Sequence, residues 1–204
     1  SGVWTIKADD GLFANSGVDG NADTFIDGTG LELMNFGATA NNKLTLGQDG
    51  GLSGKDTGLY ATSAFDLSNS GIVTGEHFGI DLNGFAGGGT ESNLNLAGKK
   101  ILIDNKGSGI IQANGPFVSH HTAINNNSNA FLTIKNAGDI LGGFDVFKDE
   151  DTNDIDDDGF TGAAIDTRGT LDLNNAKDGV IEGLIQTGWV NTKIVNVGEI
   201  QGTV

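Results

Sequence analysis

The sequence predicts an all-β protein whose strands run parallel and stack on one another. Three observations support this prediction. Glycines recur in Asn-x-Gly motifs, apolar residues alternate with polar ones before most of these motifs, and no window of helical length keeps apolar residues at positions i, i+3, i+4 and i+7. Alternation with a period of two is typical of strands that bury one face. The fold class that we expect is a parallel β-helix, or β-solenoid, with loop insertions.

The repeated motif has the form apolar-x-apolar-x-Asn-x-Gly-x-apolar-x-Gly. Its Asn-x-Gly part occurs at Asn15–Gly17, Asn35–Gly37, Asn69–Gly71, Asn105–Gly107, Asn136–Gly138 and Asn196–Gly198. The preceding apolar pairs are Leu31/Leu33, Phe65/Leu67, Ile101/Ile103 and Leu132/Ile134. The apolar-x-Gly part follows at Val73–Gly75, Ile140–Gly142 and Ile200–Gly202. Residues 101–111 and 171–183 fit the same template with two residues inserted.

Irregular spacing of this motif predicts one structural rung that carries loops of different lengths. Glycine at fixed offsets marks turns that need a positive φ or a close approach of backbones. Asparagines at equivalent turns would then hydrogen-bond to one another up and down the stack, as amide ladders do in cross-β assemblies. At roughly 20–30 residues per coil, the chain would form about 7–9 coils in a single domain, residues 1–204.

A β-sandwich is the other all-β architecture to consider. Sandwiches are built from hairpins, for which Asn-Gly between two strands is the strongest short signal. Asn-Gly occurs at Asn83-Gly84 and Asn114-Gly115 and nowhere else in the sequence. Stacked parallel rungs therefore explain the repeats better.

The strings Leu132-Thr-Ile-Lys-Asn-Ala-Gly-Asp-Ile-Leu-Gly and Lys193-Ile-Val-Asn-Val-Gly-Glu-Ile-Gln-Gly carry a family resemblance. They resemble the rungs of bacterial right-handed β-helix surface proteins, the autotransporter-passenger and haemagglutinin-like adhesin repeats. The resemblance covers most of the chain at the level of the repeat. It implies a right-handed solenoid and an extracellular location at the bacterial cell surface, and it implies no particular activity.

Composition excludes several classes of partner. With 27 acidic against 11 basic residues the net charge is −16, which argues against nucleic acid, because phosphate neutralisation needs clustered Lys and Arg. No apolar run approaches the ~18 residues of a membrane span. The absence of Cys removes disulfides, thiolate metal sites and Cys nucleophiles. Asp, a good turn residue and Ca²⁺ ligand, far outnumbers Glu, which favours a calcium-rich extracellular setting.

An acidic insertion at residues 144–168 predicts a calcium site. Asp154-x-Asp156-x-Asp158-Gly159 matches the first half of an EF-hand-type loop, in which oxygens at positions 1, 3 and 5 converge on one cation and Gly at position 6 allows a sharp turn. Phe160 would add a backbone carbonyl at position 7. The other reading of this segment is a solvated acidic loop without a fixed ion.

The closing ligand of this calcium site stays open, because position 12 is Ile165 and not Glu. Asp166, Asp149 or Asp151 are the candidates for it, together with a residue from a neighbouring rung. A second, weaker candidate site is the segment Asp19–Gly28, whose alternative is a polar turn between rungs.

The sequence offers little that indicates catalysis. Asp166 and Arg168, the one arginine of the chain, are the pair that a polysaccharide lyase or epimerase would require. His77, His120 and His121 are expected to be structural, because a titratable residue without a geometric partner is not a site. Adjacent His120 and His121 would point to opposite faces of a strand and so could not chelate one metal.

We expect a structural or adhesive protein that is stabilised by Ca²⁺ and is not an enzyme. The rung motif continues to Gly202 and neither terminus has a polar capping segment. The chain is therefore either cut from a longer solenoid or associates with copies of itself, head to tail or by strand addition, into filaments. The alternatives are a polysaccharide-active or carbohydrate-binding β-helix that acts on cell-surface polysaccharide, and a trimeric fibre segment.

Overall fold

Every regular element of the structure is a β-strand. The computed structural model describes residues 5–15, 29–33, 40–82, 96–114, 121–142, 162–188 and 191–202, without the side chains of 8–15. The strands are β1 (Thr5–Asn15), β2 (Thr29–Leu33), β3 (Asn42–Gly54), β4 (Thr57–Ala61), β5 (Phe65–Asn69), β6 (Ile72–Gly75), β7 (Phe78–Asp81), β8 (Lys100–Asn105), β9 (Ile110–Ala113), β10 (Thr122–Asn126), β11 (Phe131–Asn136), β12 (Asp139–Leu141), β13 (Ala163–Thr167), β14 (Leu171–Asn175), β15 (Val180–Glu182), β16 (Leu184–Thr187), β17 (Thr192–Asn196) and β18 (Glu199–Gln201). Across these residues no helix has the length and apolarity that spanning a membrane requires. The predicted all-β fold is confirmed.

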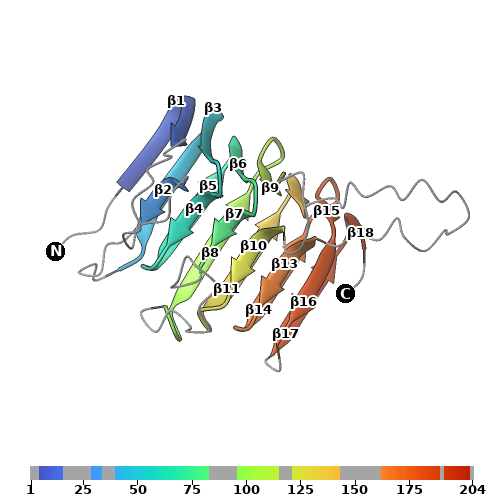
Figure 1. The fold of residues 1–204 in the computed structure, drawn as a ribbon. Coiled ribbons are helices and arrows are strands. Elements are labelled where there is room, and N and C mark those ends of the chain that lie inside the picture. The colour runs from blue at the N-terminus through green and yellow to red at the C-terminus, as the bar shows by residue number, and fades with distance from the viewer. Residues whose placement is uncertain are drawn as a thin grey trace, which may run out of the picture.

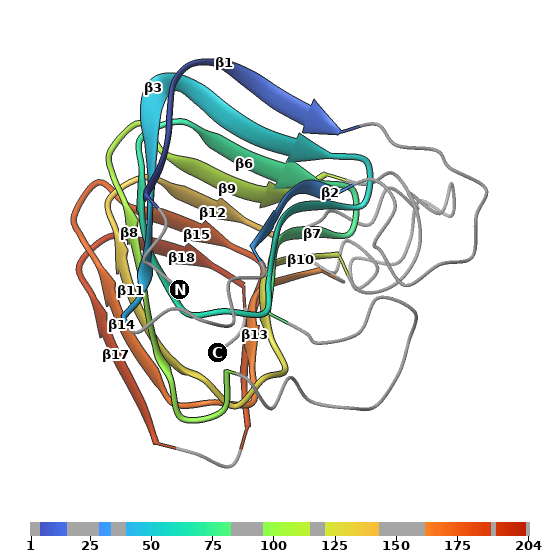
Figure 2. The ribbon, with the colours of Figure 1, turned by 90° about the vertical axis from the view of Figure 1, so that its left-hand side faces the viewer.

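The strands form two sheets in which every pair is parallel. Sheet A has twelve strands in the order β17-β14-β11-β8-β5-β3-β6-β9-β12-β15-β18, with β1 added beside β3, and sheet B has six in the order β16-β13-β10-β7-β4-β2. The long strand β3 belongs to two parts of sheet A, because Asn42–Leu46 pair with β5 and Gly51–Ser53 pair with β6. We call the part containing β5 arm 1 and the part containing β6 arm 2 (Figure 2).

From β3 onward the chain visits arm 1, arm 2 and sheet B in turn. From β6 to β15 each strand therefore pairs with the strands three before and three after it, as β8 does with β5 and β11. Layers follow one another in sequence order from the N-terminal to the C-terminal end (Figure 1). Segments that are 30 or 40 residues apart thus become direct neighbours, and the prediction of parallel stacked strands is confirmed.

The interior is lined by rows of apolar side chains that stand in register. Members of each row are at most 4 % exposed. Arm 1 contributes Leu44, Leu67, Ile103, Ile134 and Leu173, arm 2 contributes Leu52, Val73, Ile111, Ile140 and Ile181, and sheet B contributes Leu59, Ile80, Ile124, Ile165 and Ile185. Burial of these rows provides the main favourable free energy of folding.

A ladder of asparagine side chains closes the corner between arm 1 and arm 2. Each amide Nδ2 donates to the Oδ1 of the next asparagine, at 2.9, 2.8, 2.8 and 2.8 Å along the series Asn69, Asn105, Asn136, Asn175 and Asn196. The same nitrogens also donate to a backbone carbonyl of the next layer, as Asn136 does to Val180 O at 3.2 Å. The predicted amide ladder is confirmed, and we call it the Asn ladder.

The glycines after the ladder are required by close backbone approach. A Cβ at Gly71 would lie 1.8 Å from Gly50 O, and one at Gly138 would lie 2.2 Å from Gly109 O. The sequence predicted that these glycines serve either a positive φ or a close approach of backbones. The structure shows the close approach at Gly71 and Gly138. After Asn105 and Asn175 the turn has four residues and not two, which is the two-residue insertion in the template.

Two members of the predicted motif occupy other places in the fold. Leu31 and Leu33 lie in β2 of sheet B, where Leu31 pairs with Leu59, and not in arm 1. Asn15 pairs with Gly54 in β3 and so stands outside the Asn ladder. Asn35 lies outside the described residues. Local sequence around these residues fits the template, but the strand register assigns them elsewhere.

Connections differ in length according to the corner that they form. The five corners at the Asn ladder contain two or four residues each. The strands on either side of a sheet B corner are separated by the single residue Gly183 at one extreme and by the interval from Leu141 to Ala163 at the other, of which residues 143–161 lie outside the described part of the chain. The variation in length, which the irregular motif spacing predicted, is thus largest at the two corners that border sheet B.

Candidate functional site

A row of mostly polar side chains crosses the outer face of sheet B. Strand register aligns one residue from each of six layers: Glu32, Tyr60, Asp81, Asn125, Asp166 and Gln186. We call this set the polar row. Because neighbouring strands lie about 4.8 Å apart, the row presents a hydrogen-bonding group at each such interval.

In β4, β7, β10 and β13 two successive residues face inward, a local bend that brings a second row to the same outer face. Gly58 and Gly79 face arm 2, since a Cβ on Gly58 would lie 2.8 Å from Thr74 N. Ala123 and Ala164 take the corresponding places and are fully buried. The residues that follow them, Leu59, Ile80, Ile124 and Ile165, are also buried in the core. The residues on either side of each inward pair, such as Phe78 and Asp81 around Gly79 and Ile80, therefore point outward.

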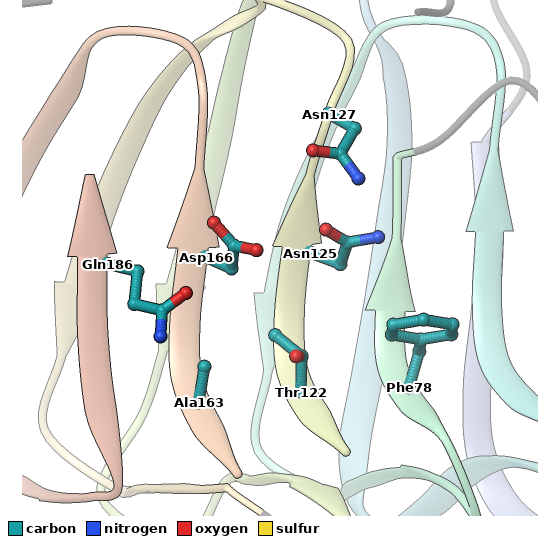
Figure 3. Close-up of a pocket in the computed structure, with 7 residues that line it drawn as sticks. All are labelled: Phe78, Thr122, Asn125, Asn127, Ala163, Asp166 and Gln186. Carbon is teal, nitrogen blue, oxygen red and sulfur yellow. The ribbon is translucent and has the colours of Figure 1, made fainter. Parts of the chain in front are cut away.

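The two outward rows line a pocket of about 200 Å³ over β7, β10, β13 and β16. Its lining residues are Phe78, Thr122, Asn125, Asn127, Ala163, Asp166 and Gln186. Figure 3 shows the side chains of Asn125, Asp166 and Gln186 side by side on β10, β13 and β16, with Thr122 and Ala163 nearer the start of β10 and β13 and Phe78 on the neighbouring β7. No basic side chain and no histidine is among the described residues that line it.

Asn125 is held in one orientation by its neighbour in the row. Its Nδ2 donates to Asp81 Oδ1 at 2.8 Å, and both side chains are 4 % exposed. Because a carboxylate accepts but does not donate hydrogen bonds, this contact fixes the amide nitrogen toward Asp81. The amide oxygen then lies on the side of Asp166 (Figure 3).

Tyr60 shows how the polar row affects ionisation. Burial, together with the negative charges of Asp81 and Glu32, raises the pKa of the Tyr60 hydroxyl from 10.0 to about 12. The side chain is 6 % exposed. Tyr60 therefore keeps its proton at neutral pH and contributes a hydroxyl group beside two acidic residues.

Of the residues predicted to bind calcium, Asp166 alone falls in the described part of the chain. It lies in β13 within the polar row, next to Asn125 and Gln186, while Ile165 before it is in the core. Outside the described residues lie Asp149, Asp151, Asp154, Asp156, Asp158 and Phe160, and also the candidate segment Asp19–Gly28. Within the described residues no three His, Cys, Asp or Glu side chains are grouped to hold a metal. The calcium site stays a prediction from the sequence.

The second residue of the predicted catalytic pair, Arg168, follows β13 directly. One residue, Thr167, lies between Asp166 and Arg168, so alternation places both side chains on the outer side of the strand. Arg168 is exposed, and it is not among the residues that line the pocket. The pair is thus adjacent on one face but does not share the pocket.

Two histidines that are remote in sequence stack against each other. The rings of His77 and His121 are 5.4 Å apart between centroids, with an angle of 9° between their planes. His77 Nδ1 also lies 2.6 Å from Asp56 Oδ1. His77 and His121 directly precede β7 and β10, which lie in adjacent layers, so their contact was not visible in the sequence. His120 lies outside the described residues.

A second sequence repeat, which our sequence analysis missed, marks the polar row. It has the form small-apolar-polar and occurs as Gly30-Leu31-Glu32, Gly58-Leu59-Tyr60, Gly79-Ile80-Asp81, Ala123-Ile124-Asn125 and Ala164-Ile165-Asp166. Alignment of the chain on this triplet predicts the register of sheet B and the members of the row.

Comparison with known proteins adds no family assignment. No family model matches the sequence, and neither the curated proteins nor the solved structures give a match.

Proposed function

We propose that the chain is a right-handed β-solenoid that serves as an extracellular structural or adhesive scaffold and associates end to end with copies of itself. The three-strand cycle supports the solenoid, because each cycle adds one layer to arm 1, arm 2 and sheet B. Counting β1, arm 1 contains seven layers, which fits the expected number of coils.

The observation that carries the proposed association is the open C-terminal edge of the stack. Strands β16, β17 and β18 are the last strands of sheet B, arm 1 and arm 2 among the described residues. Core-row residues Ile194 and Ile200 are only partly buried there, and Asn196, the last member of the Asn ladder, is exposed. A further layer would bury these groups as each earlier layer is buried.

The occupant that we propose for this edge is β1 of a second copy. β1 pairs in parallel with both halves of β3, so it spans the two arms that end in β17 and β18. In a head-to-tail contact, β1 of the next copy would cover both strands, and the amide of Asn196 would donate to its backbone, as Asn136 does to Val180 O. Repetition of such a contact generates an open filament.

Calcium and an extracellular location belong to the same proposal. They are supported by the Asp154–Asp158 loop motif, the excess of Asp over Glu and the resemblance of the rungs to bacterial surface proteins. In the proposal the ion fixes the longest connection, residues 142–162, and is not part of a reaction.

Sedimentation velocity and electron microscopy of the chain with Ca²⁺, over a wide range of concentration, test the association. Ile194→Lys places a charge in the core row at the open edge and should abolish oligomers, because a buried unpaired charge is costly. Val195→Lys is the matched control, since Val195 lies next in β17, is 44 % exposed and points outward. Oligomers should persist in this control.

A wild-type chain that stays monomeric at high concentration with Ca²⁺ would contradict the proposal, as would equal loss of oligomers in both variants. A polysaccharide lyase or epimerase is the alternative. It is less well supported, because no basic or histidine side chain is among the described residues that line the pocket beside Asp166.

A further inference from the structure

The outer face of sheet B has features that end-to-end stacking does not use. Sheet B runs along the side of the stack, whereas β16, β17 and β18 are the last strands at its C-terminal edge (Figure 1). The pocket and the polar row lie on the outer face of sheet B. Stacking requires backbone groups and core rows, whereas this face presents aligned amide and carboxylate groups beside an aromatic ring.

The pocket favours a ligand that donates hydrogen bonds. Asn125 gives its amide nitrogen to Asp81 and presents its oxygen toward Asp166. Amide and carboxylate oxygens accept hydrogen bonds and do not donate them. Two such oxygens on adjacent strands are matched by neighbouring hydroxyl groups, each of which carries one donor.

The remaining lining residues suit the same kind of ligand. Thr122, Asn127 and Gln186 can donate as well as accept, so they can satisfy the oxygen atoms of a sugar. Phe78, which is partly exposed, adds an apolar surface for the C–H face of a sugar ring. A pocket of about 200 Å³ is smaller than the roughly 300–1,000 Å³ of sites for drug-sized ligands and suits a group the size of one sugar ring.

Charge selects among sugars. Asp166 is the one charged residue among the described lining residues, and Asp81 and Glu32 lie further along the same row. Carboxylates so placed repel uronate and sulfate groups but not hydroxyl groups. The face therefore favours a neutral glycan over an acidic one.

We propose that this pocket binds one residue of a neutral, hydroxyl-rich glycan chain that runs across β7, β10, β13 and β16. Asp166 accepts hydrogen bonds from ring hydroxyls, Gln186 bonds to the adjoining residue, and Phe78 contacts the ring face. The site is independent of the open edge, so it does not depend on self-association.

Calorimetric titration of the full chain with neutral hexasaccharides of glucose and of N-acetylglucosamine, and with hexagalacturonate, tests this proposal. A neutral hexasaccharide should bind, and Asp166→Ala should weaken its binding by about tenfold to a hundredfold, the loss expected for a hydrogen bond to a charged group. Asp172→Ala, on the exposed face of β14, is the matched control and should leave binding unchanged.

A second pair of variants keeps the test decisive if Asp166→Ala alters folding. Gln186→Ala should weaken binding severalfold, whereas Gln201→Ala, which changes another exposed glutamine, in β18, should not. Absence of binding by both neutral probes would overturn the proposal, as would equal binding by each variant and its control. Tighter binding of hexagalacturonate than of the neutral probes, lost on addition of a chelator, would also overturn it in favour of cation-bridged acidic sugars.

Discussion

The side-chain amide of Asn136 donates to Asn175 Oδ1 at 2.8 Å, although 39 positions separate the two residues in the chain. Asn175 in turn donates to Gly179 O, Asn196 Oδ1 and Glu199 O at 3.1, 2.8 and 3.1 Å. One buried amide thus joins three successive layers. Such a side chain leaves several polar groups unsatisfied when it is removed.

Asn175→Ala should lower the free energy of unfolding by about 2–4 kcal/mol, because buried groups in two neighbouring layers lose their partners. Asn174→Ala is a matched control, since Asn174 is the preceding residue of β14 and is exposed. It should change stability by no more than about 0.5 kcal/mol. Urea denaturation followed by circular dichroism measures both. Equal effects of the two substitutions would mean that the ladder does not stabilise the stack.

Ionisation of Tyr60 can be followed without interference, because it is the one tyrosine of the chain. Tyrosinate absorbance at 295 nm should titrate with a midpoint near pH 12, and not near 10. Asp81→Asn should lower that midpoint, since the charge of Asp81 contributes to the raised pKa. A midpoint near 10 in the folded wild-type protein would contradict the burial of Tyr60.

The same raised pKa predicts how stability depends on pH. Between pH 10 and 12 the unfolded chain loses the Tyr60 proton and the folded chain keeps it, so the unfolded state is favoured as pH rises. The contribution of Tyr60 is therefore complete below pH 10 and declines as pH rises toward 12, by about 2–3 kcal/mol at most. Denaturation of Tyr60→Phe at pH 9 and pH 11 should show a smaller pH dependence than the wild type.

Gly58→Ala should destabilise the protein by about 1–3 kcal/mol, because the added Cβ would lie 2.8 Å from Gly79 O and from Thr74 N and O, all backbone atoms of neighbouring strands. Gly107→Ala serves as the control. Gly107 is exposed, and its Cβ would find Ala137 O at 3.8 Å as its nearest neighbour. Thermal unfolding should show a clear fall in Tm for the first variant and little change for the second. If both variants were as stable as the wild type, the inward-facing position of Gly58 in β4 would be contradicted.

Calcium at millimolar concentration should raise the Tm, and a chelator should reverse the rise, because an ion that binds the folded state stabilises it by mass action. Asp156→Asn with Asp158→Asn should remove the response. A double variant with the same change of charge, Asp172→Asn with Asp178→Asn, alters exposed residues outside the predicted loop and should retain it. No effect of calcium on the wild type would count against the loop as a site.

Arm 1 and arm 2 could be predicted from the sequence because their residues alternate strictly. Phe65 and Leu67 point inward, Asp66 points outward, and the following Asn69 marks the corner. Local rules of this kind suffice for two of the three faces of the stack and for the Asn ladder.

Sheet B was not predicted in the same detail, because its strands break the period of two. Gly79 and Ile80 are both buried, so alternation assigns one of them to the wrong face. The pocket also joins Phe78, Thr122 and Asp166, which are 44 residues apart in each successive step. No local pattern could bring these three together without the register of the layers.

Chain-length variation in this fold is separated from the part that fixes strand register. The corner at the Asn ladder admits two or four residues, whereas the corners beside sheet B join strands that are one residue apart, as at Gly183, or as far apart in sequence as Leu141 and Ala163. Foreign loops could therefore be grafted beside sheet B without shifting a single ladder asparagine, which makes the stack a scaffold on which new binding segments can be displayed in rows around an unchanged core.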